Sequence, residues 1–345
     1  MSTDEQYLFR CLALAKLGIG YAAPNPLVGS VVVHQGKIIG EGYHQKYGEA
    51  HAEVNAIAAV TDKSLLAEST IYVNLEPCAH FGKTPPCANL IIDSKIPKVV
   101  IGCVDPYAEV AGKGIERLRN AGIEVIVGVL EKESQALNKR FFTFHAKKRP
   151  YLILKWAQSA NGMIDMARDK EEKGIFWITQ PETKTLVHQW RAEEAGILVG
   201  RKTIVNDNPA LTTRVVAGPS PIRIVIDPNC QLNVAQYQIN DGAAKTYVFN
   251  SIKSGKVAAI EYIQVKPFSL ENIVATLYTL NIQSVIVEGG KHTLNTFIDA
   301  ALWDEARILT GISVIKEGIL APRISNFTRV HKYFFGKDEI QIIQR

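Results

Sequence analysis

The sequence His51-Ala52-Glu53 is followed by Pro77-Cys78 and by a second cysteine, which closes the run Thr84-Pro85-Pro86-Cys87. Together these segments supply one imidazole, two thiols and one carboxylate. Catalytic zinc keeps three protein ligands and leaves a fourth position for water, whose pKa falls to about 7 on binding. The pattern therefore predicts that His51, Cys78 and Cys87 bind Zn²⁺ and that Glu53 transfers protons.

The order of these residues matches the signature of zinc deaminases, which is His-x-Glu followed by Pro-Cys-x-x-Cys, with the glutamate as a proton shuttle. Here eight residues separate the cysteines in place of two. A metalloprotease helix is excluded because position 55 is Asn, so His-Glu-x-x-His is missing. A purely structural role for His51, Cys78 and Cys87 would leave their occurrence together and in order unexplained.

The bulk properties suggest two globular domains. At about 150 residues per domain, 345 residues correspond to two, and 47% hydrophobic with 21% charged residues is typical of a folded protein. No apolar run approaches the roughly 18 residues of a membrane span, and the N-terminus lacks signal-peptide order. We therefore expect a cytoplasmic protein with no membrane partner. Five cysteines, two of them metal ligands, do not favour a disulfide framework.

Charge gives little support for nucleic-acid binding. The net charge is +5, but basic residues form only short clusters such as Lys147-Lys148-Arg149, which we interpret as a solvated connector. No nucleic-acid partner is expected.

The first half alternates apolar strands with helical stretches, which predicts an α/β layer sandwich. We expect helices at residues 4–17, 51–60, 87–94 and 114–120, and strands at residues 28–33, 37–42, 71–75, 99–103 and 125–127.

After Pro150 the pattern restarts with an apolar strand, Tyr151 to Ala157, that contains Lys155. Lys155 either reaches solvent from a strand end or faces an anionic ligand, and the strand alone favours the first alternative. Further strands at 197–199 and 284–287 lead into Gly200-Arg201-Lys202-Thr203 and Glu288-Gly289-Gly290. Glycines after a strand suit phosphate binding or a simple turn, and without a GxGxxG fingerprint a Rossmann dehydrogenase is not indicated.

With these residues in place, the chain resembles the bifunctional deaminase-reductase family of riboflavin biosynthesis over essentially its full length. The motifs that carry the resemblance are Pro24 to Gly29, Gly40 to His44, His51-Ala-Glu53, Leu75 to Cys87, Asp105-Pro106, Val110 to Gly114, Lys155, Ser159 to Gly162, Trp177-Ile-Thr179, Arg191, Asn206 to Thr212, Arg214, Ile224 to Asp227 and Val287 to Gly290. The long cysteine gap is this family's form of the deaminase motif.

The resemblance implies a cytidine-deaminase-like three-layer α/β/α domain at residues 1–147, followed by a dihydrofolate-reductase-like α/β domain at 148–345. The first would use zinc to deaminate 2,5-diamino-6-ribosylamino-4(3H)-pyrimidinone 5′-phosphate. The second would use NADPH to reduce the ribosyl group to ribityl. The partners would then be small phosphorylated pyrimidines, and we expect a homo-oligomer, either a dimer or a tetramer.

The resemblance also implies roles for individual residues. The implied substrate contacts are Asn25, His44, His80, Lys83, Lys155, Arg191, Leu211, Arg214 and Glu288. The implied NADPH contacts are Ala157, Trp177, Thr203, Asp207, Gly290, Lys291, His292, Thr293, Leu294, Asn295 and Thr296. Phosphate recognition suits Lys83 and His44. The chain departs from many members at Ile175, where they have serine. Arg201-Lys202 are further candidates for selecting NADPH through its 2′-phosphate, a role that the resemblance itself does not imply.

Two alternatives remain open from the residues. In one, the protein is a nucleic-acid-editing deaminase with a C-terminal binding module, which predicts salt-dependent binding to single strands. The long cysteine gap and the lack of a basic, aromatic-studded tract argue against it. In the other, the second half is a noncatalytic oligomerisation module that NADPH does not stabilise.

Overall fold

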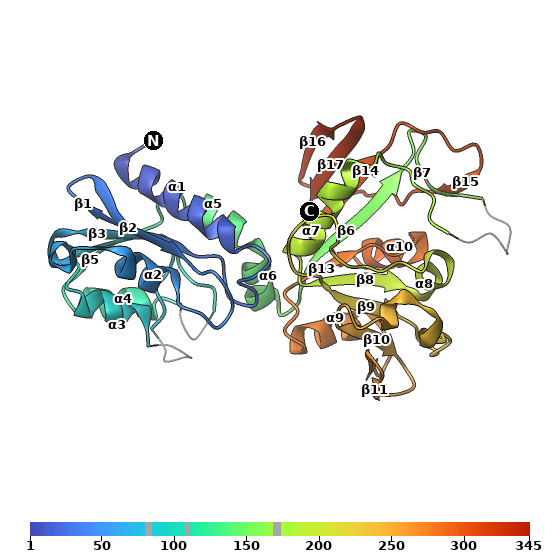
Figure 1. Cartoon of the computed structure of the whole chain (residues 1–345), viewed down its shortest axis with the longest axis horizontal. Helices are drawn as coiled ribbons and strands as arrows, with labels where there is room; N and C mark the ends of the chain where they lie inside the picture. Colours follow the sequence, from blue (N-terminus) through green and yellow to red (C-terminus); the bar gives the residue numbers. More distant parts are fainter. Residues whose placement is uncertain (80–84, 108–110, 168–173) are drawn as a thin grey trace. The chain divides into compact units, whose positions relative to one another are not determined.

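The computed structural model describes residues 1–79, 85–107, 111–167 and 174–345. The chain divides into two compact units, residues 1–148 and residues 149–345 (Figure 1). Among the described residues, no helix is long and apolar enough to cross a membrane.

Unit 1 is built on a five-stranded sheet in the order β2-β1-β3-β4-β5. The strands are β1 (Gly29–His34), β2 (Lys37–Tyr43), β3 (Thr70–Leu75), β4 (Lys98–Cys103) and β5 (Glu124–Val127). β1 pairs antiparallel with both β2 and β3, whereas β3, β4 and β5 run parallel. The carboxyl ends of β3 and β4 therefore meet at one edge of the sheet.

Helices cover both faces of this sheet, as the alternation of apolar residues requires. The helices are α1 (Thr3–Ala15), α2 (Ala52–Ala59), α3 (Cys87–Asp93), α4 (Lys113–Asn120), α5 (Glu131–Leu137) and α6 (Lys139–Lys147). On one face Val31 and Tyr72 pack with Leu8 of α1, and on the other Val32 and Ile71 pack with apolar residues of α2, α3 and α4. This confirms the predicted three-layer α/β/α domain.

Two glycines of β2 let α2 approach the sheet closely. A Cβ at Gly42 would lie 2.5 Å from the Asn55 Cβ and 2.6 Å from the Ala56 nitrogen, and one at Gly40 would lie 2.4 Å from the Ala56 carbonyl oxygen. Only glycine tolerates such contacts. The pair thus fixes the depth of α2, whose first turn carries Glu53.

Unit 2 contains a ten-stranded sheet in the order β11-β12-β10-β9-β8-β13-β6-β14-β17-β16. Its strands are β6 (Tyr151–Gln158), β8 (Gly196–Gly200), β9 (Ile222–Ile226), β10 (Thr246–Asn250), β11 (Gly255–Val257), β12 (Ile260–Gln264), β13 (Ser284–Val287), β14 (Glu305–Thr310), β16 (Arg329–Phe335) and β17 (Asp338–Gln344). From β12 to β14 the strands run parallel, and β11, β17 and β16 are antiparallel additions at the edges. Strands β7 (Met163–Met166) and β15 (Gly318–Leu320) form a separate pair.

Helices also cover both faces of the second sheet. They are α7 (Thr183–Glu193), α8 (Arg201–Asp207), α9 (Leu270–Thr279) and α10 (Lys291–Asp299). Leu152, Leu154 and Trp156 of β6 share a core with α9 and α10, whereas Tyr151 and Ile153 pack on the α7 side. Lys155 follows in this alternation and therefore lies on the α7 side of the sheet.

The expected elements of unit 1 are present with boundaries shifted by a few residues at most, but α5 and α6 were not expected. In unit 2 the strands expected from the sequence correspond to β6, β8 and β13. The other strands, including the C-terminal hairpin β16–β17, and the helices α7 and α9 were not expected. Short strands such as β11, whose residues are all exposed, carry no apolar alternation to reveal them.

Replacing Gly42 by Ala is expected to destabilise unit 1 by about 1–3 kcal/mol, because the added methyl group overlaps Asn55 and Ala56. The displacement of α2 should also reduce the zinc retained per chain. Calorimetric unfolding and metal analysis measure the two effects. Lys37→Ala, at an exposed position on the same strand, is the control. Equal stability of the two variants would contradict this packing account.

Candidate active sites

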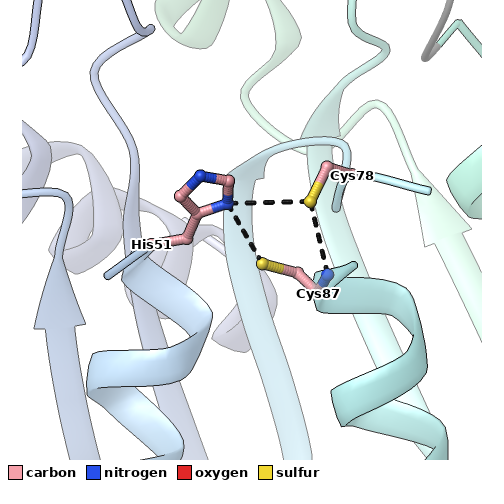
Figure 2. A group of neighbouring side chains, drawn as sticks. All are labelled: His51, Cys78 and Cys87. Atoms are coloured by element: carbon pink, nitrogen blue, oxygen red, sulfur yellow. Dashed lines mark hydrogen bonds between the residues drawn. The ribbon is translucent and has the colours of Figure 1, made fainter. Parts of the chain in front are cut away.

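The three predicted metal ligands lie together at one edge of the unit 1 sheet (Figure 2). His51 is the N-cap residue of α2, Cys78 follows the carboxyl end of β3, and Cys87 is the first residue of α3. The His51 Nδ1 atom lies 3.3 Å from the Cys87 Sγ and 3.6 Å from the Cys78 Sγ. Three segments far apart in the sequence thus present their ligand atoms to one point.

These distances fit a zinc ion. In a tetrahedral site, with Zn–N near 2.0–2.1 Å and Zn–S near 2.3 Å, a nitrogen and a sulfur ligand lie about 3.6 Å apart. All three ligand atoms are within 4.8 Å of one another. Soft sulfur and imidazole ligands in a set of three are also the donors of a catalytic zinc site.

The surroundings favour a thiolate at Cys78. A hydrogen bond from Cys87, and then the nearby His51, lower the pKa of the Cys78 thiol to about 4, although burial opposes this. The backbone N–H of Cys87 also donates to the Cys78 sulfur at 3.3 Å. A thiol ligand must be deprotonated to bind a metal. Cys78 meets this condition, whereas its hydrogen bond with Cys87, and then burial, raise the pKa of the Cys87 thiol.

Glu53 lies in the first turn of α2 and is 3% exposed. Burial raises the pKa of its carboxyl to about 7, with His51 acting in the opposite direction. A carboxyl group that titrates near neutrality can both accept and release a proton. Glu53 therefore has the chemistry of a proton carrier beside the candidate metal site.

Asn25 and His44 form a hydrogen-bonded pair in unit 1. The His44 Nδ1 lies 3.0 Å from the carbonyl oxygen of Ala50, and its Nε2 lies 3.0 Å from the Nδ2 of Asn25. Because a carbonyl oxygen only accepts, Nδ1 must carry the proton, and Nε2 then accepts from the Asn25 amide. Burial lowers the pKa of His44, which also favours the neutral ring.

Two predicted substrate contacts, His80 and Lys83, lie outside the described residues. A residue that the sequence analysis missed lies just before the metal ligand Cys78. Glu76 is 4% exposed and accepts backbone N–H groups of Asp105, Gly112, Gly114 and Ile115 at 2.9–3.3 Å. It thereby ties the start of α4 to the loop that carries Cys78. Its position between Leu75 and Pro77 was the available signal.

In unit 2, Lys155, Arg191 and Glu288 form a buried ionic cluster. Arg191 Nη2 lies 2.8 Å from Glu288 Oε2, and Lys155 Nζ lies 3.7 Å from Glu288 Oε1. The Lys155 side chain is 13% exposed, so the expectation that it reaches solvent is wrong. The neighbouring acid stabilises the ammonium group in the interior.

The charges in this cluster are unequal, with two cations on one carboxylate. Burial alone would raise the pKa of Glu288, but Arg191 and Lys155 lower it to about 2. Burial, and after it the effect of Arg191, lower the pKa of Lys155 despite the carboxylate. The site therefore has an excess of positive charge, which suits an anionic ligand.

Arg214 adds a third cation near the same place. Its Nη1 donates to the Thr212 hydroxyl at 3.2 Å, while Arg191 donates to the Thr212 carbonyl at 3.4 Å. His188, which the sequence analysis missed, accepts the Arg214 backbone N–H at 3.0 Å, and burial followed by Arg191 lowers its pKa to about 4. Leu211 is 2% exposed and packs in the core beside α8.

The predicted cofactor residues fall into two groups. Thr203 of α8 accepts the backbone N–H of Gly290 at 3.3 Å, and a Cβ on Gly200 would lie 2.7 Å from the Thr293 hydroxyl. The starts of α8 and α10 therefore meet where the parallel strands β8 and β13 end. Leu294 is an exception because its side chain is in the hydrophobic core.

The remaining cofactor candidates are more dispersed. Asp207 is the last residue of α8. The backbone carbonyl of the preceding residue, Asn206, accepts the backbone N–H of Gly174 at 2.9 Å. Trp177 is 55% exposed, and the Lys184 Nζ lies 3.5 Å from its ring centroid. Ala157 lies near the carboxyl end of β6, and Lys291, His292, Asn295 and Thr296 lie in the first two turns of α10.

Comparison with known proteins identifies the two units separately. A family model for the cytidine and deoxycytidylate deaminase zinc-binding region matches residues 1–103. A model for the RibD C-terminal domain matches residues 150–312. The protein therefore belongs to the class of enzymes in which one chain contains a zinc-binding deaminase domain followed by a reductase domain.

Relatives match nearly the whole chain. The riboflavin biosynthesis protein RibD of Aquifex aeolicus is 40% identical over 322 residues, which cover 92% of this chain and 89% of the relative. A crystal structure of a diaminohydroxyphosphoribosylaminopyrimidine deaminase/5-amino-6-(5-phosphoribosylamino)uracil reductase from Thermotoga maritima is 36% identical, with a TM-score of 0.89, and covers 99% of this chain and 98% of that chain. Acinetobacter baumannii RibD aligns with a TM-score of 0.88 at 29% identity, covering 99% and 98% of the two chains.

The chain belongs to the RibD family of riboflavin biosynthesis proteins. It is a bifunctional enzyme with a hydrolase (deaminase) domain and an NADP-dependent oxidoreductase (reductase) domain. The predicted cofactors, Zn²⁺ and NADPH, are confirmed at the level of these domains. Both alternatives, a nucleic-acid editor and a deaminase with a noncatalytic second half, are disfavoured.

Glu288→Gln is expected to lower the free energy of unfolding of unit 2 at pH 7 by about 3 kcal/mol, because a pKa near 2 in place of 4.5 is worth about 1.4 kcal/mol per unit. A carboxyl whose folded-state pKa is depressed stabilises the fold above the unfolded pKa. The difference in free energy of unfolding between wild type and Glu288→Gln should therefore shrink as the pH falls from about 4.5 to about 2.

Tryptophan fluorescence can follow the unfolding of unit 2, because all four tryptophans belong to this unit. They are Trp156, Trp177, Trp190 and Trp303. The exposed Glu317→Gln variant is the control and should change stability by less than about 0.5 kcal/mol. If Glu288→Gln lowers the free energy of unfolding as much at pH 2 as at pH 7, the lowered pKa of Glu288 is contradicted.

Proposed function

We propose that unit 1 hydrolytically deaminates 2,5-diamino-6-ribosylamino-4(3H)-pyrimidinone 5′-phosphate, with His51, Cys78 and Cys87 holding zinc and Glu53 carrying protons. The observation that carries this proposal is the spacing of the three ligand atoms, 3.3–3.6 Å from imidazole to sulfur, beside a buried carboxylate. When bound, zinc lowers the pKa of a coordinated water to about 7. Glu53 accepts a proton from the attacking water and delivers it to the leaving amine.

Asn25 then orients the heterocycle. Since its amide nitrogen donates to His44, its Oδ1 is left to accept a hydrogen bond and has no partner among the described residues. An acceptor at this point selects an N–H group of the pyrimidine. We propose that His44 acts through Asn25, because a neutral ring with both nitrogens bonded is poorly suited to a phosphate. Lys83 remains the predicted phosphate contact in unit 1.

For unit 2 we propose NADPH-dependent reduction of the ribosyl group to ribityl. The excess of cations around Glu288, from Lys155, Arg191 and Arg214, supports binding of the substrate phosphate at this site. The Thr203–Gly290 contact supports a cradle for the cofactor phosphates at the ends of β8 and β13. Hydride transfer needs the nicotinamide and the sugar carbon held close and aligned, so positioning should dominate the catalysis.

Other parts of the assignment stay predictions. They include the homo-oligomeric state, the cytoplasmic location, the absence of a nucleic-acid partner and the preference for NADPH through Arg201-Lys202. The consequence of Ile175, which is exposed here, belongs with them.

Glu53→Gln is expected to lower the deamination rate by a factor of about 10²–10⁴, because the amide cannot carry the proton. Zinc content and NADPH oxidation with the deaminated substrate should stay at wild-type values. Ammonia release, metal analysis and absorbance of NADPH measure the three quantities. Glu49→Gln, at an exposed position before α2, is the matched control. A parallel loss of both activities with zinc retained would show that the two sites are not separate.

NADPH at about 100 times its Kd is expected to stabilise unit 2 by about 2.7 kcal/mol. The shift appears in the tryptophan-monitored unfolding transition, which excludes unit 1. Thr203→Val removes the hydroxyl that fixes Gly290 and should weaken NADPH binding about tenfold, whereas the exposed Thr328→Val should not. No shift in the wild-type protein would instead favour a noncatalytic second half.

A further inference from the structure

Asp338 begins strand β17 of the C-terminal hairpin, directly after the turn Gly336-Lys337. The family model for the reductase domain ends at residue 312, so this hairpin lies beyond it. Asp338 is nevertheless 0% exposed. A carboxylate that deep in a protein requires specific hydrogen-bond donors.

The topology places this turn at the functional edge of the sheet. β17 pairs antiparallel with β14, with Glu339 opposite Thr310, the last residue of β14. β14 runs parallel to β6, where Thr310 is opposite Gln158. The start of β17 therefore lies beside the carboxyl ends of the parallel strands, which is the edge that carries the residues proposed to bind substrate and cofactor.

The donors to Asp338 are the first residue of α7 and Gln180, three residues before it. Its Oδ2 accepts the backbone N–H of Gln180 at 2.8 Å and the hydroxyl of Thr183 at 2.5 Å. The N-cap residue of α7, Glu182, makes no side-chain cap hydrogen bond of its own. A carboxylate from a distant strand thus bonds the segment that leads into α7, where the helix dipole also favours a negative charge.

Two parts of the reductase site depend on the position of this helix start. Arg191 and His188 lie further along α7, and Trp177 lies three residues before Gln180. Gly311, just after β14, lies against the carbonyl oxygen of Ile178, since a Cβ there would be 2.1 Å from it. The segment from Trp177 to Thr183 is therefore held at Ile178 by the end of β14 and at Gln180 and Thr183 by the hairpin.

We infer that Asp338 is a positioning residue of the reductase site, which holds the segment from Trp177 to Thr183, and α7 behind it, where substrate and NADPH bind. This inference rests on the proposed reductase function. The C-terminal hairpin is accordingly a part of the active-site architecture. Asp338 itself does not need to touch either ligand.

The test compares Asp338→Ala, Asp338→Asn and Glu339→Ala in the full-length zinc-loaded protein. Asp338→Ala should raise the KM for NADPH and the Kd from tryptophan quenching about tenfold, because the bonds to Gln180 and Thr183 are both lost. Asn retains an acceptor oxygen of the same size and should restore both values to within about threefold of wild type. Glu339, the next residue on the hairpin, pairs with Lys332 and should have no effect on either constant.

Deamination provides an internal reference, since its rate should not change in any of these variants. A purely structural role predicts a lower melting temperature with unchanged KM and Kd well below melting, and that result would overturn the inference. If Asp338→Ala does not fold, Thr183→Val removes one of the two bonds and should still raise the Kd measurably; an unchanged Kd would again overturn it. Wild-type protein that oxidises no NADPH would instead refute the proposed function.

Discussion

Parallel pairing of strands is the constraint on which both candidate sites depend. In a parallel ladder all carboxyl ends lie at one edge, so the residues that follow separate strands are brought together. In unit 1 this edge carries Cys78 after β3, and in unit 2 it carries Glu288 after β13 and Gly200 at the end of β8. Each of these residues lies at the end of a rigid strand or at most three residues beyond it, which limits its freedom without any ligand present.

Buried carboxylates then hold the loops at these edges. Glu76 accepts hydrogen bonds from backbone N–H groups at the start of α4. Asp338 accepts hydrogen bonds from Gln180 and Thr183. Glu288 pairs with Arg191 and Lys155. Each of these groups is expensive to bury unless its donors are in place. A carboxylate of this kind therefore stabilises one conformation of the loop to which it is hydrogen-bonded. That conformation fixes the positions of the nearby active-site residues.

The sequence signal of the candidate metal site is local and chemical, and the structure brings the ligand atoms of its three predicted ligands together. His51, Glu53, Cys78 and Cys87 were identified from residue type and order, and the predicted helices and strands of unit 1 follow from apolar periodicity. The burial of Lys155 was not expected because it depends on pairing with Glu288, which lies far away in the sequence, directly after β13. His188 and Asp338 were missed for the same reason, since their contacts join residues 26 and 155–158 positions apart. Long-range pairing leaves no periodic trace in a single sequence.

The central claim is that one chain carries two separate chemistries, one dependent on zinc and one on NADPH. The most direct measurement is to follow ammonia and NADPH together in one reaction, with and without a zinc chelator. Starting from the diamino substrate, the chelator should abolish ammonia release and also NADPH oxidation, because the reductase receives no deaminated product. Starting from the deaminated substrate, NADPH oxidation should continue at the uninhibited rate. Loss of NADPH oxidation in this second reaction would contradict two independent sites.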